Sequence, residues 1–305
     1  MIRRSVSPRS AFTLIELLIA IAIIALLAGL LLPAISKVRT FANRTTATSE
    51  MTQLAAACTK FQGDWGFYPP SSFTIPTNVN QPGYALLKSK YSRWTPTTDA
   101  MGNIIGTSIL ANAGETLCGN QCVVYFLRGP ARAPWQAAAT YADFSGWSHD
   151  GPYSPTTTST SAMGPYYTFA TGRLQLLNVP IAGTVFFYTG NLPFFADPFG
   201  TPYACFSARK DTGKIDPTQG RFYWGPITTA PGVGPVIDNG KPVNEKSMQI
   251  ICAGENGSDD TLNPNYGFGP GIGWVAGTGA YASSASGGDD FGNFNGGAPL
   301  NRRGD

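Results

Sequence analysis

The residue with the clearest chemical consequence is Glu16, a carboxylate inside a long apolar run near the N-terminus. Residues 12–35 read FTLIELLIAIAIIALLAGLLLPAI, and no charged residue occurs from Leu17 to Ser36. Placing a charge in lipid costs several kcal/mol on insertion scales, so such residues are rare and usually functional. Two interpretations are open: Glu16 pairs with a positive group of another molecule, or its side chain reaches the lipid headgroups.

The uncharged stretch after Glu16 has the length of a membrane span. At about 1.5 Å per residue, its roughly 20 residues cover about 30 Å, the thickness of a bilayer's hydrocarbon core. Three arginines precede it (Arg3, Arg4 and Arg9), which predicts a cytoplasmic N-terminus and an exported C-terminal part. A secretory signal peptide is one alternative, but its apolar core should be only about 7–15 residues long. A plain membrane anchor is another, and Glu16 argues against it.

The residues around Glu16 resemble a known processing signal. Ala11-Phe12-Thr13-Leu14-Ile15-Glu16 is similar to the cleavage and methylation motif of prepilins, in which Gly usually precedes Phe-Thr-Leu-Ile-Glu. The resemblance to type IV pilin-like proteins, and to type II secretion pseudopilins in particular, implies that prepilin peptidase cuts between Ala11 and Phe12 and methylates the new N-terminal Phe12. Ala11 takes the place of the usual glycine.

Cleavage would give Glu16 a natural partner. It creates a positive amine on Phe12 in an apolar environment, where a lone charge is expensive and a well-paired one much less so. If Glu16 of one subunit meets the Phe12 amine of its neighbour, the pair sets the axial stagger of the subunits. Pro33 lies in the same span, as in many family members, and we expect it to kink or locally melt the helix.

Beyond the span, the pattern predicts an amphipathic continuation of the helix over residues 37–63. One stripe recurs at three- and four-residue steps and should face a core: Val38, Phe41, Thr45, Thr48, Met51, Leu54, Cys58 and Phe61. The predicted organisation is a cleaved basic leader (1–11), a transmembrane half-helix (12–36), this amphipathic half (37–63) and an extracytoplasmic domain (64–305) with a loop-rich insertion at about 70–180.

The expected fold class is α+β: the pilin fold, with a long N-terminal helix packed on a small antiparallel sheet. Strands are predicted in short apolar runs: 166–170, 174–179, 184–188, 203–208, 221–224 and 247–253. Residues 122–127 (CVVYFL) fit either a strand or a buried helix. The turn Asp197-Pro198-Phe199-Gly200-Thr201-Pro202-Tyr203 closely resembles the Asp-Pro-Trp-Gly-x-Pro-Tyr turn of major pseudopilins. Residues 249–257 are similar to that family's last strand and the turn that follows it.

Two further sites are candidates. The resemblance to major pseudopilins implies a C-terminal calcium site, for which Asp259, Asp260, Asp289 and Asp290 could supply carboxylates; two solvated acidic turns are the alternative. Cys118 and Cys122 are close enough in sequence for a small disulfide loop, which an oxidising compartment would favour. They could equally be small buried apolar residues.

Other functions find little support in the composition. The charge of +3 depends on the leader arginines, so no clustered basic face predicts nucleic-acid binding. His149 is the single histidine, which disfavours zinc, and a lone surface histidine is far more common than a Ser-His-Asp triad. We expect no enzyme but a filament subunit that is anchored once in the bacterial inner membrane, faces the periplasm and assembles on the inner-membrane platform with itself or other pilins. A membrane-anchored adhesin or minor pilin, or a tethered binding or enzymatic domain, is the alternative.

Overall fold

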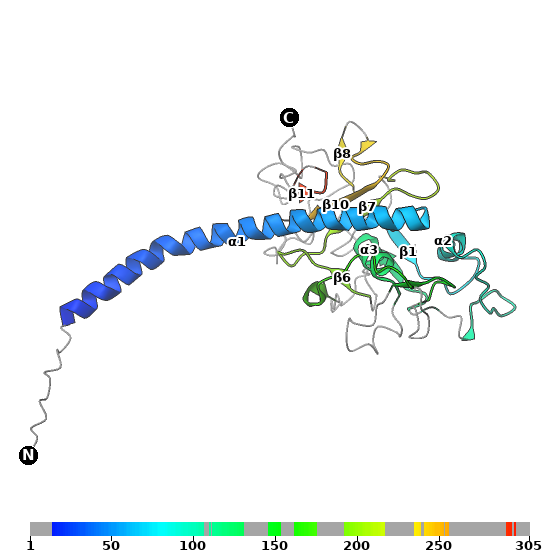
Figure 1. The fold of residues 1–305 in the computed structure, drawn as a ribbon, viewed down its shortest axis with the longest axis horizontal. Helices are drawn as coiled ribbons and strands as arrows, with labels where there is room; N and C mark the ends of the chain where they lie inside the picture. Colours follow the sequence, from blue (N-terminus) through cyan, green and yellow to red (C-terminus); the bar gives the residue numbers. More distant parts are fainter. Residues whose placement is uncertain are drawn as a thin grey trace, which may run out of the picture. The chain divides into compact units, whose positions relative to one another are not determined.

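The computed structural model describes residues 14–106, 110, 112–130, 146–153, 162–175, 192–216, 235–238, 241–252, 254–255, 291–294 and 296. The chain divides into two units, Met1–Asn43 and Arg44–Asp305. A long apolar helix leads and small antiparallel sheets follow (Figure 1), so the fold is α+β, as predicted, and is consistent with a pilin-like fold.

The leading helix, α1, covers Leu14–Trp65 and continues through Pro33 without interruption. Of the predicted kink or local melting at Pro33, the local melting is therefore wrong, because a helix this long keeps its remaining hydrogen bonds when proline removes one; the kink stays a prediction. The predicted end near Gly63 is also slightly early. Gly66 has φ +79° and donates its N–H to Gln62 O at 2.8 Å, so this residue forms the left-handed C-terminal cap.

The second unit buries one stripe of the C-terminal part of α1. The buried side chains recur at helical spacing: Ala47, Met51, Leu54, Cys58, Phe61 and Trp65. The predicted stripe is confirmed from Met51 onward and is wrong before it, since Val38 and Phe41 are 67 % and 72 % exposed and Thr45 is exposed as well. Ala47, which the pattern missed, takes the buried position one turn before Met51.

All strand pairs among the described residues are antiparallel. The three-stranded sheet has the order β11-β10-β7, formed by Phe291–Gly292, Met248–Cys252 and Ala204–Ser207. The two-stranded sheets are β1 (Ser72–Thr74) with β2 (Thr116–Cys118), β3 (Trp147–Ser148) with β4 (Ala162–Met163), β5 (Leu174–Gln175) with β6 (Phe194–Phe195), and β8 (Ile237–Asp238) with β9 (Lys241–Pro242).

The strand predictions have mixed outcomes. Those at 203–208 and 247–253 are confirmed by β7 and β10, and the start of 174–179 by β5. Residues 166–170 form no strand and instead precede the 3-10 helix η4 (Thr171–Arg173). The predictions at 184–188 and 221–224 lie outside the described residues.

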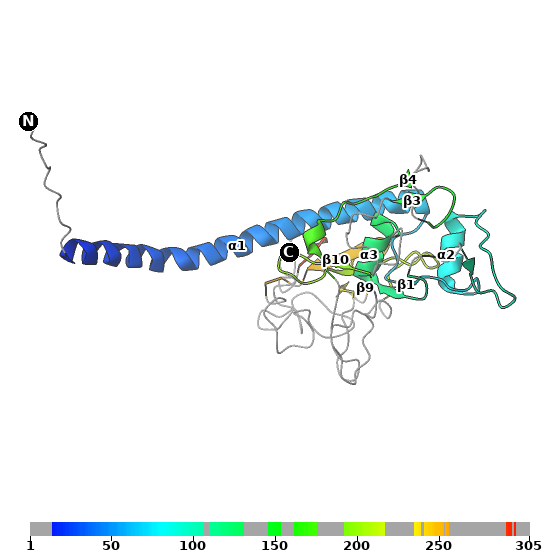
Figure 2. The same ribbon diagram turned by 90° about the horizontal axis from the view of Figure 1, so that it is seen from below.

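The predicted insertion contributes two helices and part of the core. Helix α2 (Pro82–Lys90) lies where only loops were expected. Helix α3 (Gly119–Arg128) contains the CVVYFL run and is buried on every face, which settles the choice between strand and helix. Figures 1 and 2 show α3, β7 and β10 beside the C-terminal part of α1.

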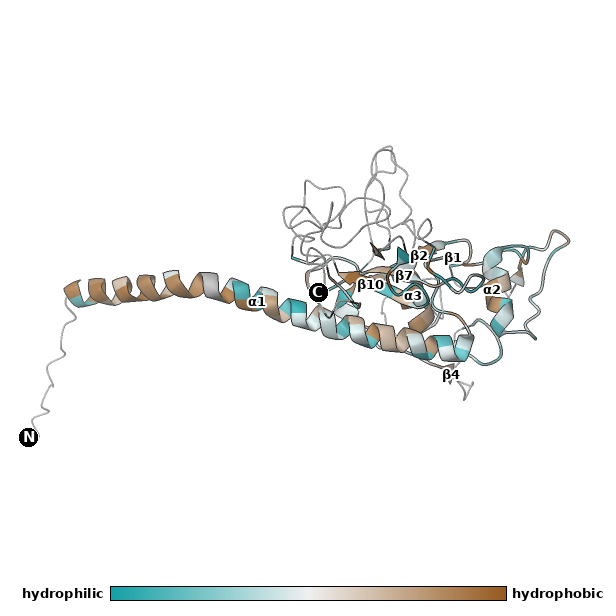
Figure 3. Cartoon of the chain, turned by 90° about the horizontal axis from the view of Figure 1, so that it is seen from above, coloured by the Kyte–Doolittle hydropathy of each residue, from teal (hydrophilic) through white to brown (hydrophobic). Residues whose placement is uncertain are grey.

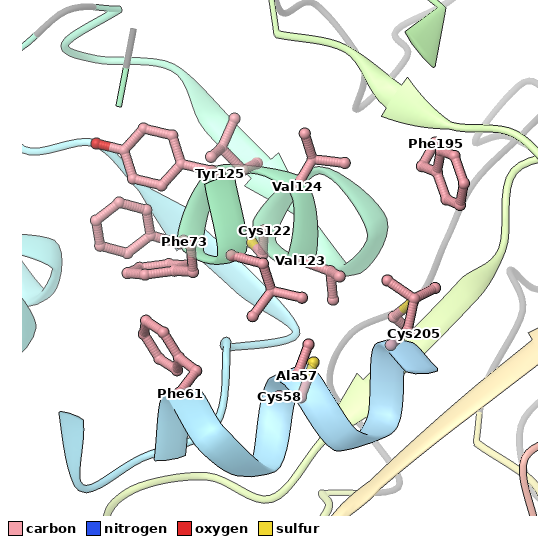
Figure 4. Packing of buried hydrophobic residues seen from close by; sticks show 14 of the residues in the cluster. Ala57, Cys58, Phe61, Phe73, Cys122, Val123, Val124, Tyr125, Phe195 and Cys205 are labelled. Atoms are coloured by element: carbon pink, nitrogen blue, oxygen red, sulfur yellow. The ribbon is translucent and has the colours of Figure 1, made fainter. Parts of the chain in front are cut away.

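Aromatic side chains from distant segments fill the core. Phe61 stacks on Trp65 with ring centroids 4.9 Å apart, and Phe126 of α3 stacks on Trp147 at 5.7 Å. Phe61 and Phe126 meet edge to face at 5.6 Å, an arrangement that aromatic quadrupoles favour. In Figure 4, Phe61 and Cys58 of α1 point toward Cys122 and Val123 of α3. The segment around α3 is thus part of the domain's core.

Candidate assembly segment and its anchorage

The proposed assembly residue Glu16 lies in the first turn of α1, where its side chain is exposed. A carboxylate at this place interacts favourably with the positive end of the helix macrodipole. The predicted cleavage residues, Ala11 and Phe12, lie outside the described residues. Since α1 begins at Leu14, cleavage after Ala11 would leave two residues between the new amine and the described start of the helix.

The residues that follow Glu16 form a helix surface that is apolar on all sides. Every large apolar side chain from Leu14 to Leu32 is more than half exposed, with Leu14 at 81 % and Ile19 at 52 %. Figure 3 shows this part of α1 in brown all round, whereas its C-terminal part alternates between brown, white and teal. A helix that is hydrophobic all round requires an apolar environment. Fully burying one such side chain stabilises by about 1.5–3 kcal/mol, so the whole surface represents tens of kcal/mol.

Within the part of the chain that the structure describes, α1 is the one helix long and apolar enough to cross a membrane. None of its most apolar stretch is buried. The core helix of a soluble protein can match this length and composition, but it would be mostly buried. A signal sequence near the N-terminus can have the same length and composition. Composition alone therefore does not distinguish a membrane span from a signal sequence.

Comparison with protein families separates them. The family description "Prokaryotic N-terminal methylation motif" matches residues 7–32, which include the leader's Arg9, the Ala11–Phe12 bond and Glu16. This segment is a prepilin-type cleavage and methylation signal. No curated protein and no solved structure shows significant similarity to the chain.

The prepilin-type signal is the hallmark of type IV pilin-like proteins. It implies processing by prepilin peptidase and polymerisation as a pilin-like subunit. Together with the exposed apolar helix, it points to anchoring in a membrane. The signal covers less than a tenth of the chain, so the folded domain must be understood from its own contacts.

A second carboxylate on α1, Glu50, is held inside the domain. Arg173, in η4 and next to β5, donates from both terminal nitrogens to Glu50, with Nη2 2.6 Å from Oε2, and the Tyr203 hydroxyl donates to the same Oε2 at 2.7 Å. Arg173 also donates to Ala196 O and lies over the Phe195 ring, 4.5 Å from its centroid. Bidentate arginine–carboxylate pairs fix orientation as well as distance. This cluster therefore fastens α1 to three distant segments of the domain.

The turn that starts at Asp197 has the tight geometry expected from its sequence. Asp197 Oδ1 accepts the N–H groups of Phe199 and Thr201 at 2.8 and 3.0 Å, and Gly200 has φ +98°. Its other oxygen, Oδ2, accepts the Cys252 thiol of β10 at 2.9 Å. Burial raises the pKa of Asp197 to about 6, although these bonds act against the shift. The turn leads directly into β7 and joins it to β10.

The predicted calcium ligands cannot be placed. All four aspartates lie outside the described residues: Asp259, Asp260, Asp289 and Asp290. Phe291, which follows Asp290, begins β11 and pairs with β10. Within the described ranges, no three His, Cys, Asp or Glu residues lie close enough to hold a metal ion. Calcium binding therefore stays a prediction.

The predicted Cys118–Cys122 disulfide is not formed. Cys122 is a buried thiol on α3 whose side chain packs among apolar neighbours (Figure 4), as in the alternative interpretation. Cys118 ends β2, and its side chain is not described. Three more buried thiols, Cys58, Cys205 and Cys252, come from α1, β7 and β10. Burial raises the pKa of Cys58 and Cys205, which keeps both in the unreactive thiol form.

Several anchoring residues were not recognised from the sequence. Nothing in the sequence marked Glu50 as an anchoring residue or Arg173 as its partner. Asn120 of α3 joins β6 to the residue before β7 by donating to Phe195 O and Tyr203 O at 3.0 and 2.9 Å. Nothing in the sequence marked Asn120, which lies between Gly119 and Gln121 just before the apolar run 122–127. His149 is exposed, in agreement with its interpretation as a surface histidine.

Proposed function

We propose that the chain is a structural subunit of a type II secretion pseudopilus or a related type IV pilus-like filament. Prepilin peptidase processes it between Ala11 and Phe12, and the inner-membrane platform then assembles it with copies of itself or other pilins. The domain faces the periplasm, and the proposal assigns it no catalytic activity. The observation that carries the proposal is the continuity of the prepilin-type signal with a helix surface that is apolar and exposed all round.

Two energies of different size support this assignment. Burial of the apolar surface is worth tens of kcal/mol, so the part of α1 from Leu14 to Leu32 is stable in lipid or among other apolar helices but not in water. This free energy of burial is nearly independent of the stagger between subunits, because apolar side chains occur on all sides of the helix. A carboxylate stranded in the same environment costs several kcal/mol, and pairing with an amine removes much of that cost. Burial therefore drives association, and Glu16 selects the stagger between subunits.

Mass spectrometry of the mature N-terminus tests the processing step. The expected product begins at Phe12 and carries one methyl group on its amine. Ala11→Leu should leave the leader attached, because the peptidase site normally takes a small residue, whereas Ala11→Gly should be processed at least as well as the parent. An intact leader on the parent chain would overturn the proposal.

Filament type can be resolved by location. Short filaments confined to the cell envelope, together with loss of protein secretion on deletion, would identify a pseudopilus. Long extracellular fibres containing this chain would identify a surface pilus or an adhesive minor subunit instead.

A further inference from the structure

A rigid hairpin at residues 97–105 presents an apolar side chain to solvent. Ile105 donates its N–H to Thr97 O at 2.9 Å, and the backbone N–H of Asp99 donates to Asn103 O at 3.0 Å. A β-bridge joins Thr98 to Ile104. Met101 lies at the tip of this hairpin.

Polar side chains fix the backbone of Met101 on both sides. Asp99 Oδ1 accepts the N–H of Met101 and that of Asn103, each at 2.9 Å, while Asn78 Nδ2 donates to Met101 O at 3.1 Å. Asn103 also donates from Nδ2 to Asp99 Oδ2 at 2.9 Å. The hydrogen bonds that the Asp99 carboxylate accepts, with the one from the Asn103 side chain foremost, lower the pKa of Asp99. The tip is therefore preorganised at neutral pH.

Met101, whose backbone this network holds in place, is 79 % exposed. Among the described residues after Phe41, Met101 and Ile105 are the large apolar side chains that are exposed. One exposed methionine is ordinary on a protein surface. A backbone held by several side-chain bonds so that an exposed methionine keeps its place is typical of an interface anchor, since a rigid apolar tip loses little entropy on binding.

The same domain has an apolar groove with a volume of about 760 Å³. Its described apolar lining comes from the exit of α1, from β1 and from α2: Phe67, Tyr68, Phe73, Pro82, Ala85 and Leu86. The Ser207 N–H and hydroxyl donate to Ser71 Oγ and Pro69 O at 2.9 and 2.6 Å, which holds the two walls together. Charged residues from 209 to 216 also line the groove, and Lys210 Nζ lies 5.4 Å from the Phe67 ring centroid. Grooves of this size are typical binding sites.

We propose that the Met101 hairpin of one copy inserts into this groove of a second copy. A thioether makes favourable contacts with aromatic rings, and the half-buried Tyr68 in the groove lining offers one. The tip and the groove are different surfaces of one chain, so the contact is heterologous, and in a filament it would repeat from copy to copy. The inference rests on the proposed filament function and adds a contact between globular domains to the one between N-terminal helices.

Crosslinking in the full-length, membrane-inserted protein tests the contact. The double variant Met101→Cys/Ala85→Cys places one thiol on the tip and one at the groove, and a short bismaleimide should yield a ladder of dimers, trimers and larger species. The matched control, Met101→Cys/Ser89→Cys, moves the second thiol to an exposed position of α2 that is not among the lining residues. The parent chain measures the background from native thiols. A ladder of equal strength in the control, or none in the test variant, would overturn the proposal.

Substitutions at the tip provide a second measurement that does not depend on added cysteines. Met101→Glu should lower the yield of filaments at least tenfold, whereas Met101→Leu should keep it within about twofold. Asp99→Ala loosens the hairpin but leaves Met101 in place, and should give an intermediate loss. Normal filaments from Met101→Glu would refute the tip–groove contact and leave the proposed function intact. Normal filaments from Glu16→Ala would refute the function itself.

Discussion

The two parts of α1 carry similar residues in different surroundings. Each has a glutamate and a series of large apolar side chains, but residues 14–43 expose theirs, whereas residues 44–65 bury one stripe in the domain. Glu50 is paired with Arg173 and Tyr203 of the same chain. Glu16 lies in an exposed first turn beside an apolar surface. The difference shows that the chain completes its own structure from residue 44 onward and leaves the surface of the first part to be covered by lipid or other subunits.

The largest effect should come from removing the Glu16 carboxylate. Glu16→Ala is expected to abolish filament assembly, because the amine of a neighbouring subunit would lose its partner in an apolar environment. The domain should remain folded, with an unchanged melting temperature in detergent. Electron microscopy and sedimentation of sheared filaments measure the first effect, and circular dichroism measures the second. Glu50→Ala serves as the matched control: it should lower the melting temperature of the domain and leave filament assembly intact.

Two phenylalanines on α1 sharpen the same comparison. Phe61 is fully buried and contacts Trp65, Phe67 and Phe126, whereas Phe41 is 72 % exposed. Phe61→Ala should lower the free energy of unfolding by about 3–5 kcal/mol because it leaves a cavity. Phe41→Ala should change it by less than about 0.5 kcal/mol. Denaturant unfolding in detergent measures both, and equal losses would contradict the division of α1.

Breaking the cluster at Glu50 should have an intermediate effect. Glu50→Ala leaves Arg173 half-buried without its carboxylate, and we expect a loss of about 2–3 kcal/mol, typical of hydrogen bonds to charged groups. Glu50→Gln keeps one acceptor for the Tyr203 hydroxyl and should lose less. Thermal unfolding of the two variants gives the order. If both match the parent, the cluster contributes nothing to the fastening of α1.

The smallest effect concerns pH. The folded-state pKa of Asp197, about 6, lies above the ordinary value of 3.8, so the folded state binds this proton more tightly than the unfolded state. Its contribution to stability is therefore fully present below pH 3.8 and is lost as the pH rises to about 6. Asp197→Asn should remove that part of the pH dependence of the melting temperature.

Asp99 serves as a control, because its pKa is shifted in the opposite direction from that of Asp197. Its pKa is lowered by bonds from Asn103, so its contribution is lost as the pH falls below the ordinary value. Asp99→Asn should leave the decline of stability between pH 4 and pH 6 unchanged. A parent protein whose stability rises across that interval would show that other groups outweigh Asp197.

Local signals in the sequence predicted the membrane-facing helix, the processing signal, the turn at Asp197 and the strands β7 and β10. Each of these depends on composition or on residues that are neighbours in the chain. The failures have long-range causes. Residues 122–127 were compatible with two structures because a segment buried on all sides carries no periodicity. The strand predicted at 166–170 failed because aromatic packing, with Phe169 against Phe195 and Tyr167, holds that segment outside any sheet.

What the sequence determined by itself is the need for processing, an apolar environment and a partner charge near Glu16, since all three arise within one continuous stretch of about 25 residues. Only the tertiary structure decided that Glu50 is satisfied by Arg173 and Tyr203, which lie more than a hundred positions away. It also decided that α3 is part of the core and that a fixed Met101 and an apolar groove occur on one domain. The physical reason is that such contacts depend on which distant segments pack together, and packing joins residues whose spacing in the chain carries no common pattern.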